Sequence, residues 1–353
     1  MSACLELCLP PHGAIREALV LIDRGQRGIV LVTDSERRLL GTITDGDVRR
    51  AMLENVSLDA PVSQLLARKA ERYSRPVTAL AGTGDSALLQ LMHDHVVHQV
   101  PLVDEQGRVV DLVTMDDLID EPPVMQAVIM AGGFGKRLRP LTEEVPKPML
   151  PVGDRPLMQR TIEQLRGAGI RRVNVTTHYL PEKITGHFGD GAAFGVELNY
   201  VSEETPLGTA GALGLIEAPT EPLLVINGDL LTGVNFRAML MYHREHRADL
   251  TVGVRQFIMQ VPYGVVDAEG GNVTAVREKP DVHFLVNAGI YLLEPSVYQF
   301  IEPGTHADMP DLIHRLLDAG RVVSSFPIHE YWLDIGKHDD YLRAQEDVKS
   351  GQI

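Results

Sequence analysis

The sequence predicts an α/β protein in which a mostly parallel, doubly wound (Rossmann-like) sheet follows a smaller α/β unit. Short apolar strands alternate with helical stretches after residue 125, one pattern occurs twice before residue 122, and Asp120-Glu-Pro-Pro-Val124 separates the two regions. Strand–helix alternation is typical of parallel sheets covered by helices, and prolines disfavour a helix that continues through them. Because 353 residues exceed one typical core, we expect domains at 1–121 and 125–353, joined by a linker at 122–124.

The composition is typical of a soluble globular protein. Hydrophobic residues make up 44% and charged residues 23%, and no apolar run approaches the ~20 residues of a membrane-spanning helix. The N-terminus lacks the basic stretch and apolar core of a secretory signal, so we expect a cytoplasmic protein. A net charge of -15 argues against nucleic acid or an anionic membrane as a partner.

Two copies of one pattern, offset by 70 residues, make up the first region, at about 8–60 and 76–121. Each copy has an amphipathic helix, an apolar strand, a polar turn, a second strand that ends in Thr-x-x-Asp, and the start of another helix. The motif consists of Thr44 and Asp47 in the first copy, and of Thr114 and Asp117 in the second. An Asp in the first turn of a helix is a common cap for exposed backbone amides, which explains the motif without a ligand.

This paired unit resembles the CBS domain pair. The resemblance implies that the hydroxyls of Thr44 and Thr114 and the carboxylates of Asp47 and Asp117 bind the ribose of an adenosine-type ligand, so an adenine nucleotide is an expected partner. CBS pairs also serve only as assembly units; this alternative stays open, and we expect a homo-oligomer. Asp111 in the second copy replaces the Gly41 of the first, which weakens the case for a second ligand site.

The second region begins with a strand at 127–130 that leads directly into a glycine-rich loop. In such a sheet, ligands bind at the C-terminal ends of the strands. Further strands are expected at 172–177, 197–201, 223–227 and 250–255, and helices at 158–166, 208–216 and 236–246.

The glycine-rich loop opens a basic cluster, Lys136, Arg137, Arg139 and Lys147, in an otherwise acidic chain. A Walker loop needs Ser or Thr after its Lys, but Arg137 follows Lys136, and Leu138 stands where a dinucleotide fingerprint needs its third glycine. The loop retains amides that can approach a triphosphate closely and an Arg that can clamp phosphate oxygens. These features suit a leaving pyrophosphate.

Two ordered motifs, GGFGKRLRPLT at 132–142 and PKPMLPV at 146–152, closely resemble those of the sugar-1-phosphate nucleotidylyltransferases. The resemblance extends over about 125–347 and implies a sheet of the nucleotidyltransferase type. It implies that Arg137 grips the departing pyrophosphate and that Lys147 contacts phosphate near the reacting phosphorus. The loop residues expected to bind the nucleotide are Ala131, Gly132, Gly133 and Gly135.

Two carboxylates are expected to hold a divalent cation. Asp229 ends the apolar strand at 223–227, and Asp334 lies in the sequence WLDIG at 332–336. Carboxylate oxygens suit hard cations that bridge to a triphosphate. An isolated Asp at a strand end is often only a turn residue, so the pairing of Asp229 with Asp334 around Mg²⁺ is implied by the resemblance.

Recognition of the base is expected within 200–211. Uracil and thymine suit a Gln amide, whereas the N1 and N2 donors of guanine suit a carboxylate; this segment holds Glu203 and Glu204 and no Gln. Its likeness to GDP-sugar-forming members favours GTP. The resemblance places nucleotide contacts at Glu203, Glu204, Pro206, Gly208 and Thr209, and sugar-phosphate contacts at Gly264, Glu278, Lys279 and Asn287.

The predicted function is transfer of a nucleoside monophosphate from an NTP, with GTP favoured, to a hexose 1-phosphate, with mannose or glucosamine 1-phosphate favoured. The products are an NDP-sugar and pyrophosphate. Uridylyl, thymidylyl or cytidylyl transfer within the same family stays open. A non-catalytic nucleotide sensor is the alternative from another class.

Overall fold

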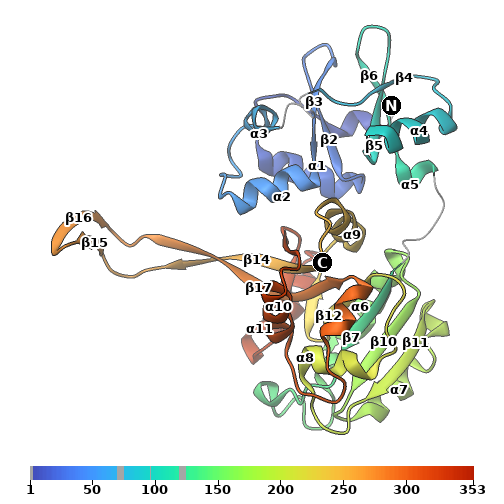
Figure 1. Ribbon diagram of the computed structural model, residues 1–353, viewed down its shortest axis with the longest axis vertical. Coiled ribbons are helices and arrows are strands. Elements are labelled where there is room, and N and C mark those ends of the chain that lie inside the picture. Colours follow the sequence, from blue (N-terminus) through green and yellow to red (C-terminus); the bar gives the residue numbers. More distant parts are fainter. Residues whose placement is uncertain (1–2, 70–74, 96, 119–124) are drawn as a thin grey trace. The chain divides into compact units, whose positions relative to one another are not determined.

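The computed structural model describes residues 3–69, 75–95, 97–118 and 125–353. The chain forms two compact units, Met1–Glu121 and Pro122–Ile353 (Figure 1). The linker predicted at 122–124 lies outside the described residues. Within those residues, no helix has the length and apolar character to cross a membrane.

The N-terminal unit contains two three-stranded sheets, with strand orders β1-β2-β3 and β4-β5-β6. In each sheet the first pair of strands is parallel and the second antiparallel. The 70-residue repeat is confirmed, since α1, β2 and β3 recur 70 positions later as α4, β5 and β6. The elements are η1 Ala3–Leu7, β1 Cys8–Leu9, α1 Ile15–Gly25, β2 Ile29–Thr33, β3 Leu39–Thr44, α2 Asp45–Leu53, α3 Val62–Arg68, β4 Ala79–Leu80, α4 Asp85–His95, β5 Gln99–Val103, β6 Val109–Thr114 and α5 Met115–Leu118.

The C-terminal unit is built on a seven-stranded sheet of order β11-β10-β7-β12-β17-β14-β18. Strands β11, β10, β7 and β12 run parallel to one another, β17 runs antiparallel to β12 and β14, and β18 is parallel to β14. The predicted mostly parallel α/β sheet is therefore confirmed. The larger elements are β7 Gln126–Met130, α6 Leu157–Gly167, β10 Arg172–Thr177, α7 Pro181–Phe188, β11 Glu197–Ser202, β12 Leu223–Asn227, α9 Phe236–Glu245, β14 Leu250–Gln260, β17 Asp281–Leu293, α10 Met309–Asp318, β18 Val323–Pro327 and α11 His338–Lys349.

Shorter elements connect these strands and helices and carry most of the motifs found in the sequence. They are η3 Lys136–Leu138, η4 Lys147–Met149, β8 Pro151–Val152, β9 Arg155–Pro156, η5 Ala192–Phe194, α8 Gly208–Gly211, η6 Ala212–Leu215, β13 Leu230–Thr232, β15 Val265–Glu269, β16 Asn272–Arg277, η7 Pro295–Phe300 and β19 Trp332–Asp334.

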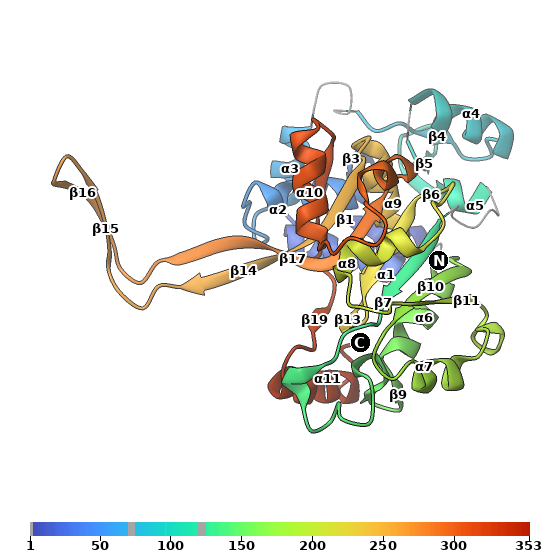
Figure 2. The same cartoon turned by 60° about the horizontal axis from the view of Figure 1, so that its bottom comes forward.

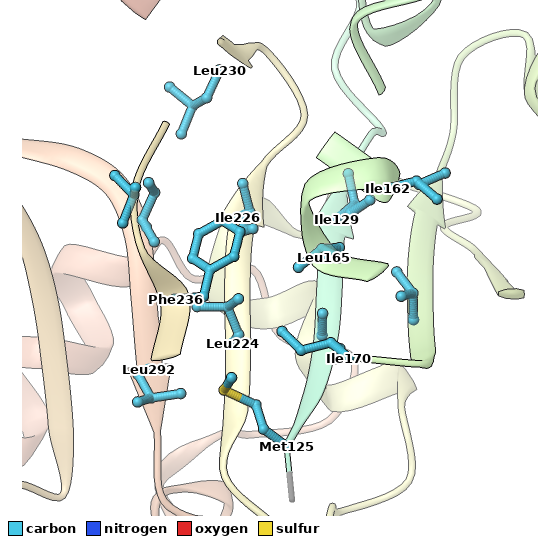
Figure 3. Packing of buried hydrophobic residues seen from close by; sticks show 14 of the residues in the cluster. Met125, Ile129, Ile162, Leu165, Ile170, Leu224, Ile226, Leu230, Phe236 and Leu292 are labelled. Carbon is cyan, nitrogen blue, oxygen red and sulfur yellow. The ribbon is translucent and has the colours of Figure 1, made fainter. Parts of the chain in front are cut away.

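Apolar side chains cover both faces of this sheet. On one face, Ile162 and Leu165 of α6 and Phe236 of α9 pack over Ile129 and Leu224 of the central strands (Figure 3). On the other face, α10 and η7 pack against the same strands through a second buried cluster. The strands are apolar on both sides because helices cover both sides, and this holds their C-terminal ends in fixed positions.

Two predicted boundaries were wrong. The helix predicted at 208–216 is a single turn, α8, followed by the 3₁₀ helix η6. Gly208 has a φ of +76°, and a Cβ at Gly211 would lie 2.4 Å from the Thr305 carbonyl oxygen, so these glycines serve close backbone packing rather than a long helix. The strand predicted at 250–255 continues to Gln260.

Candidate active site

The glycine-rich loop and Asp229 both follow the C-terminal ends of two central strands of the sheet. Strands β7 and β12 are parallel, with Asn227 in register with Met130, so both chains leave the sheet side by side. The Gly228 amide donates a hydrogen bond of 2.9 Å to the Met130 carbonyl oxygen. A Cβ at Gly228 would lie 2.6 Å from that same oxygen, so glycine is required for this close approach.

Asp229 forms an ion pair with Lys147. The Lys147 ammonium lies 2.6 Å from Oδ2 of Asp229, and the lysine is buried. Lys147 opens the 3₁₀ helix η4 between two prolines, which fix its backbone. The other oxygen, Oδ1 of Asp229, is buried and has no hydrogen-bond partner among the described residues. A buried acceptor without a donor is unusual and leaves this oxygen available to a ligand.

Asp334 is brought beside Asp229 by a short antiparallel ladder. Strands β13 and β19 pair so that Leu230 is opposite Asp334, and the Ile335 amide donates to the Asp229 carbonyl at 3.0 Å. Burial, and then the neighbouring Asp229 carboxylate, raise the pKa of Asp334, while the Lys147 and Arg137 cations oppose that rise. The structure therefore brings together the two carboxylates that were paired at the sequence level.

Arg137 faces the same group of charges. It lies in η3, directly before Leu138, which is buried in a cluster with Leu333 and Ile335 on either side of Asp334. A Cβ at Gly336 would lie 3.7 Å from Nη1 of Arg137, so the guanidinium rests on the β19 turn. Arg137, Lys147, Asp229 and Asp334 thus form one site, called here the carboxylate site.

The two aspartates of the carboxylate site are the residues that could hold a divalent cation. No group of three or more His, Cys, Asp or Glu that could hold a metal ion occurs among the described residues. Mg²⁺ is commonly bound by one or two carboxylates, with water and substrate phosphates completing its shell. Two adjacent aspartates, one with an unpartnered oxygen, match that donor set.

The glycines of the loop let its backbone pass close to the C-terminal ends of the strands. Gly135 has a φ of +61°, and its carbonyl accepts a 2.8 Å hydrogen bond from the Thr142 hydroxyl. The Ala131 amide donates to the Thr176 carbonyl, which anchors the start of the loop to β10. Around Gly133, a Cβ would meet no atom within 4 Å, so this part of the loop is open.

Glu203 lies against the glycine-rich loop. It is buried, and a Cβ at Gly132 would lie 2.6 Å from its Oε1, while Oε2 accepts from the Leu207 amide at 3.0 Å. Glu204 is exposed, as is Pro206. Of the two acidic residues considered for base recognition, Glu203 is therefore the buried one that lies against the glycine-rich loop.

Gly208 and Thr209 are held against the start of α10. The Thr209 amide donates to the Asp308 carboxylate at 3.1 Å, and its hydroxyl accepts from the Met309 amide at 2.9 Å. A Cβ at Gly208 would lie 2.5 Å from the Ala307 carbonyl oxygen. These contacts fix the segment that follows Glu203.

The four residues predicted to contact the sugar phosphate occupy two different places. Asn287 accepts from the Gly289 amide at 3.0 Å. A Cβ at Gly289 would lie 2.5 Å from the Asn227 amide nitrogen. Asn287 therefore lies near the C-terminal end of β12, two residues before Asp229 of the carboxylate site. Gly264 and Glu278 lie close to each other on the projection formed by β15 and β16, and Lys279 follows Glu278 there (Figure 1). The structure does not bring these three to Asp229.

In the N-terminal unit, both Thr-x-x-Asp motifs act as helix caps. Asp47 accepts from the Thr44 amide at 2.9 Å and pairs with Lys69 at 2.7 Å. Burial alone would raise the pKa of Asp47, but Lys69 and these hydrogen bonds together lower it. Asp117 accepts from the Thr114 amide and pairs with Arg27, both at 2.8 Å.

One residue at the C-terminal end of β12 was missed at the sequence level. The Oδ1 of Asn227 is buried and has no hydrogen-bond partner in the described part of the chain. The available signal was its position two residues before Asp229, at the polar end of an apolar strand.

Comparison with known proteins agrees with this geometry. The family model described as nucleotidyl transferase matches residues 126–351. The chain belongs to the nucleotidyl transferase family. A second model, the CBS domain, matches residues 6–54 and 70–123, so the predicted CBS pair is confirmed.

Two relatives of this nucleotidyl transferase are named for different activities. It is 33% identical over 234 residues to a mannose-1-phosphate guanylyltransferase of Mycobacterium tuberculosis, covering 64% of this chain and 65% of that one. It is also 33% identical over 250 residues to a UTP–glucose-1-phosphate uridylyltransferase of Synechocystis, covering 65% of this chain and 64% of the relative. The chain thus spans just under two thirds of the length of these relatives.

A solved structure shares the fold of the C-terminal unit. It is a provisionally named glucose-1-phosphate thymidylyltransferase of Bacillus anthracis in complex with sucrose, 25% identical, with a TM-score of 0.51, and the match covers 63% of this chain and 94% of that one. The sheet of this nucleotidyl transferase is therefore of the expected type.

Proposed function

We propose that the C-terminal unit transfers a nucleoside monophosphate from a nucleoside triphosphate to a sugar 1-phosphate and releases pyrophosphate. The observation that carries this proposal is the carboxylate site, in which the buried Lys147, the exposed Arg137 and two adjacent carboxylates meet beside a glycine-rich loop. The phosphate oxygen of the sugar attacks the α-phosphorus in line. Because this nucleophile is already an anion, catalysis consists of positioning and charge neutralisation.

Each residue of the site has one task in this reaction. Arg137 holds the departing pyrophosphate, with the loop amides at Gly132, Gly133 and Gly135 beside it. Lys147, kept in place by Asp229, neutralises charge near the α-phosphorus. A Mg²⁺ ion held by Asp229 and Asp334 would supply further charge neutralisation on the triphosphate.

GTP is the proposed nucleotide and mannose 1-phosphate the leading sugar. Glu203 supports GTP, because a carboxylate next to the glycine-rich loop can accept hydrogen bonds from guanine N1 and N2. The relative from Mycobacterium tuberculosis supports the same pair of substrates. The uridylyltransferase relative keeps UTP with glucose 1-phosphate as the second candidate. Glucosamine 1-phosphate remains a further candidate for the sugar.

The reaction is tested by measuring pyrophosphate release from GTP, UTP, dTTP and CTP, each with mannose, glucose and glucosamine 1-phosphates. Release that needs both a nucleotide and a sugar phosphate supports the transferase. If the protein binds a nucleotide but releases no pyrophosphate with any pair, it is a nucleotide sensor and the proposed reaction is wrong.

The base assignment is tested by Glu203→Gln, with Glu204→Gln as the matched control on the exposed neighbour. A Gln keeps an oxygen for the Leu207 amide but loses the charge that pairs with guanine. We expect E203Q to lower kcat/KM for GTP by about 10- to 100-fold, the value of a charged hydrogen bond, and to spare UTP. Equal losses for both nucleotides would show that Glu203 only supports the loop.

A further inference from the structure

His178 lies between the glycine-rich loop and Glu203, and the reaction proposed above gives it no task. It directly follows β10, which lies in the sheet between β7 and β11 (Figure 2). Strand β7 leads into the glycine-rich loop, and β11 leads to Glu203. A Cβ at Gly132 would lie 3.5 Å from the Cβ of His178 and 2.6 Å from Oε1 of Glu203. His178 therefore lies against the loop at the point where Glu203 also approaches it.

The imidazole of His178 binds the main chain of Glu203. Its Nδ1 lies 2.7 Å from the Glu203 carbonyl oxygen. Because a carbonyl oxygen only accepts hydrogen bonds, Nδ1 carries the proton and donates. The parallel ladder between β10 and β11 ends at Thr177 and Ser202, and the Glu203 amide still donates to the Thr177 carbonyl at 2.8 Å. The His178 side chain thus supplies the donor that a longer strand would give to the next carbonyl.

Glu203 is held at three points by these contacts. Thr177 accepts from its amide, His178 donates to its carbonyl, and the Leu207 amide donates to its Oε2 at 3.0 Å. Each carboxylate oxygen can accept two hydrogen bonds, so Oε2 keeps capacity for a base. Recognition of guanine N1 and N2 by one carboxylate needs both oxygens in a fixed plane. The placement of the Glu203 main chain therefore decides whether the carboxylate can read guanine.

Phe134 of the glycine-rich loop fixes the plane of the imidazole. The rings of Phe134 and His178 pack edge to face, with centroids 5.2 Å apart and planes at 84°. Phe134 also packs against Tyr179, with centroids 5.6 Å apart. The Tyr179 hydroxyl donates to the carbonyls of Thr142 and Glu143, beyond the loop. Aromatic pairs prefer such arrangements, so the loop and the turn after β10 hold the ring from two sides.

The contacts of His178 distinguish the base from the triphosphate. Within the described part of the chain, the hydrogen bond to Glu203 is the only one that the imidazole makes. The carboxylate site is held together by other contacts, chiefly the ion pair of Lys147 with Asp229. Loss of the imidazole should therefore disturb recognition of the base more than recognition of the triphosphate.

We propose that His178 is a positioning residue for the nucleobase. Its Nδ1–H group fixes the Glu203 main chain so that the carboxylate meets the N1 and N2 donors of guanine, a role that rests on the proposed use of GTP. Selectivity for guanine then depends on a donor at the place of Nδ1. Affinity for the triphosphate does not depend on it.

The role is tested with the full-length chain by comparing GTP with ITP, whose base lacks the N2 amino group. Calorimetry in Mg²⁺ without sugar phosphate gives the Kd of each nucleotide, and pyrophosphate release with mannose 1-phosphate gives kcat/KM. We expect the wild type to prefer GTP by about 10- to 100-fold, the value of one hydrogen bond to a charged group. His178→Leu, which lacks the donor, should bind both nucleotides almost equally, mainly because GTP binds more weakly.

Two further variants separate the two nitrogens of the ring. His178→Asn can donate from near the place of Nδ1 and should keep most of the preference for GTP. His178→Gln carries its amide nearer the place of Nε2 and should lose the preference. Because H178Q keeps a polar side chain, it takes the place of H178L if the leucine variant does not fold. His187→Leu is the matched control, since it removes an exposed imidazole from α7, and it should leave the preference unchanged.

The possible failures can be told apart. If the wild type binds GTP and ITP equally, the assignment of guanine is wrong and the role of His178 is wrong with it. If the wild type prefers GTP and H178L and H178Q keep that preference, GTP stands as the nucleotide but His178 only caps the end of the strand. An equal loss for both nucleotides would also overturn the role, because it would show a general effect on the fold. The Kd values decide between these results even if no pyrophosphate is released.

Discussion

Among single residues, Arg137 has the most specific role that can be tested. It is one of two cations that act on the Asp334 carboxylate, and its guanidinium lies beside Gly336 although the residue is exposed. We expect Arg137→Ala to lower kcat by about 100-fold or more, the usual loss for one group that stabilises developing charge. Arg139→Ala, two residues along the same basic cluster, is the control and should keep most of the activity. Steady-state rates of pyrophosphate release measure both, and normal turnover by R137A would refute the role.

The residues of the carboxylate site could be named from the sequence, but their contacts could not. The motifs identify Arg137, Lys147 and Asp229, because each lies in a glycine- or proline-rich loop or at the end of an apolar strand. The meeting of Asp229 with Asp334 depends on a ladder of three residue pairs between segments about a hundred positions apart. No local pattern encodes such a pairing.

Among the elements, the turn from β12 to β13 is the most constrained. Gly228 passes so close to β7 that Gly228→Ala must displace Asp229, so we expect a loss of activity together with a drop of about 1–3 kcal/mol in the free energy of unfolding. Gly233→Ala, just beyond the same short strand, is the control, because a Cβ there meets nothing closer than 3.9 Å. Urea unfolding and rate assays on both variants make the comparison, and a G228A protein that matches G233A would contradict this packing.

Helix α9 contains a buried histidine that makes the fold sensitive to acid. His243 Nδ1 lies 2.7 Å from the Thr251 hydroxyl and Nε2 lies 3.1 Å from the Glu294 carboxylate. Burial lowers the pKa of His243 even though Glu294 favours its charged form. The ring is therefore neutral when folded, whereas the unfolded residue titrates near 6.5.

The sign of the pH dependence follows from this depressed pKa. The stability contribution of His243 is complete above pH 6.5 and falls as the pH drops through the lower pKa of the folded state, because the unfolded chain takes up the proton first. We expect the free energy of unfolding to fall from about pH 8 to about pH 5 by more in the wild type than in His243→Gln. Urea titrations at both values test this, and equal slopes would exclude His243 as the cause.

Element types were predictable where the apolar period was strong, and uncertain where glycine intervened. The strands at 127–130 and 223–227 were predicted nearly to the residue because they are short apolar runs buried on both faces. The helix expected at 208–216 failed because Gly208, Gly211 and Gly214 permit close contact with the segment before α10. The apolar residues at 257–259 resemble a buried strand in sequence, so their exposure could not be foreseen.

At the scale of the whole molecule, the chain combines a CBS pair with a nucleotidyl transferase unit. In the CBS pair, the motif carboxylates already have cationic partners, Lys69 for Asp47 and Arg27 for Asp117. Binding of an adenine nucleotide there remains a prediction, and it would have to compete with those ion pairs for the two aspartates.

We propose that two aspartates and two cations form one phosphate-handling site with Mg²⁺. The most direct measurement is the initial rate of pyrophosphate release from GTP and mannose 1-phosphate across a Mg²⁺ titration, for the wild type and for Asp334→Asn. We predict that a chelator abolishes the wild-type rate, that Mg²⁺ restores it, and that D334N needs a much higher Mg²⁺ concentration or stays inactive. A D334N protein with the wild-type rate and the wild-type Mg²⁺ dependence would contradict the account.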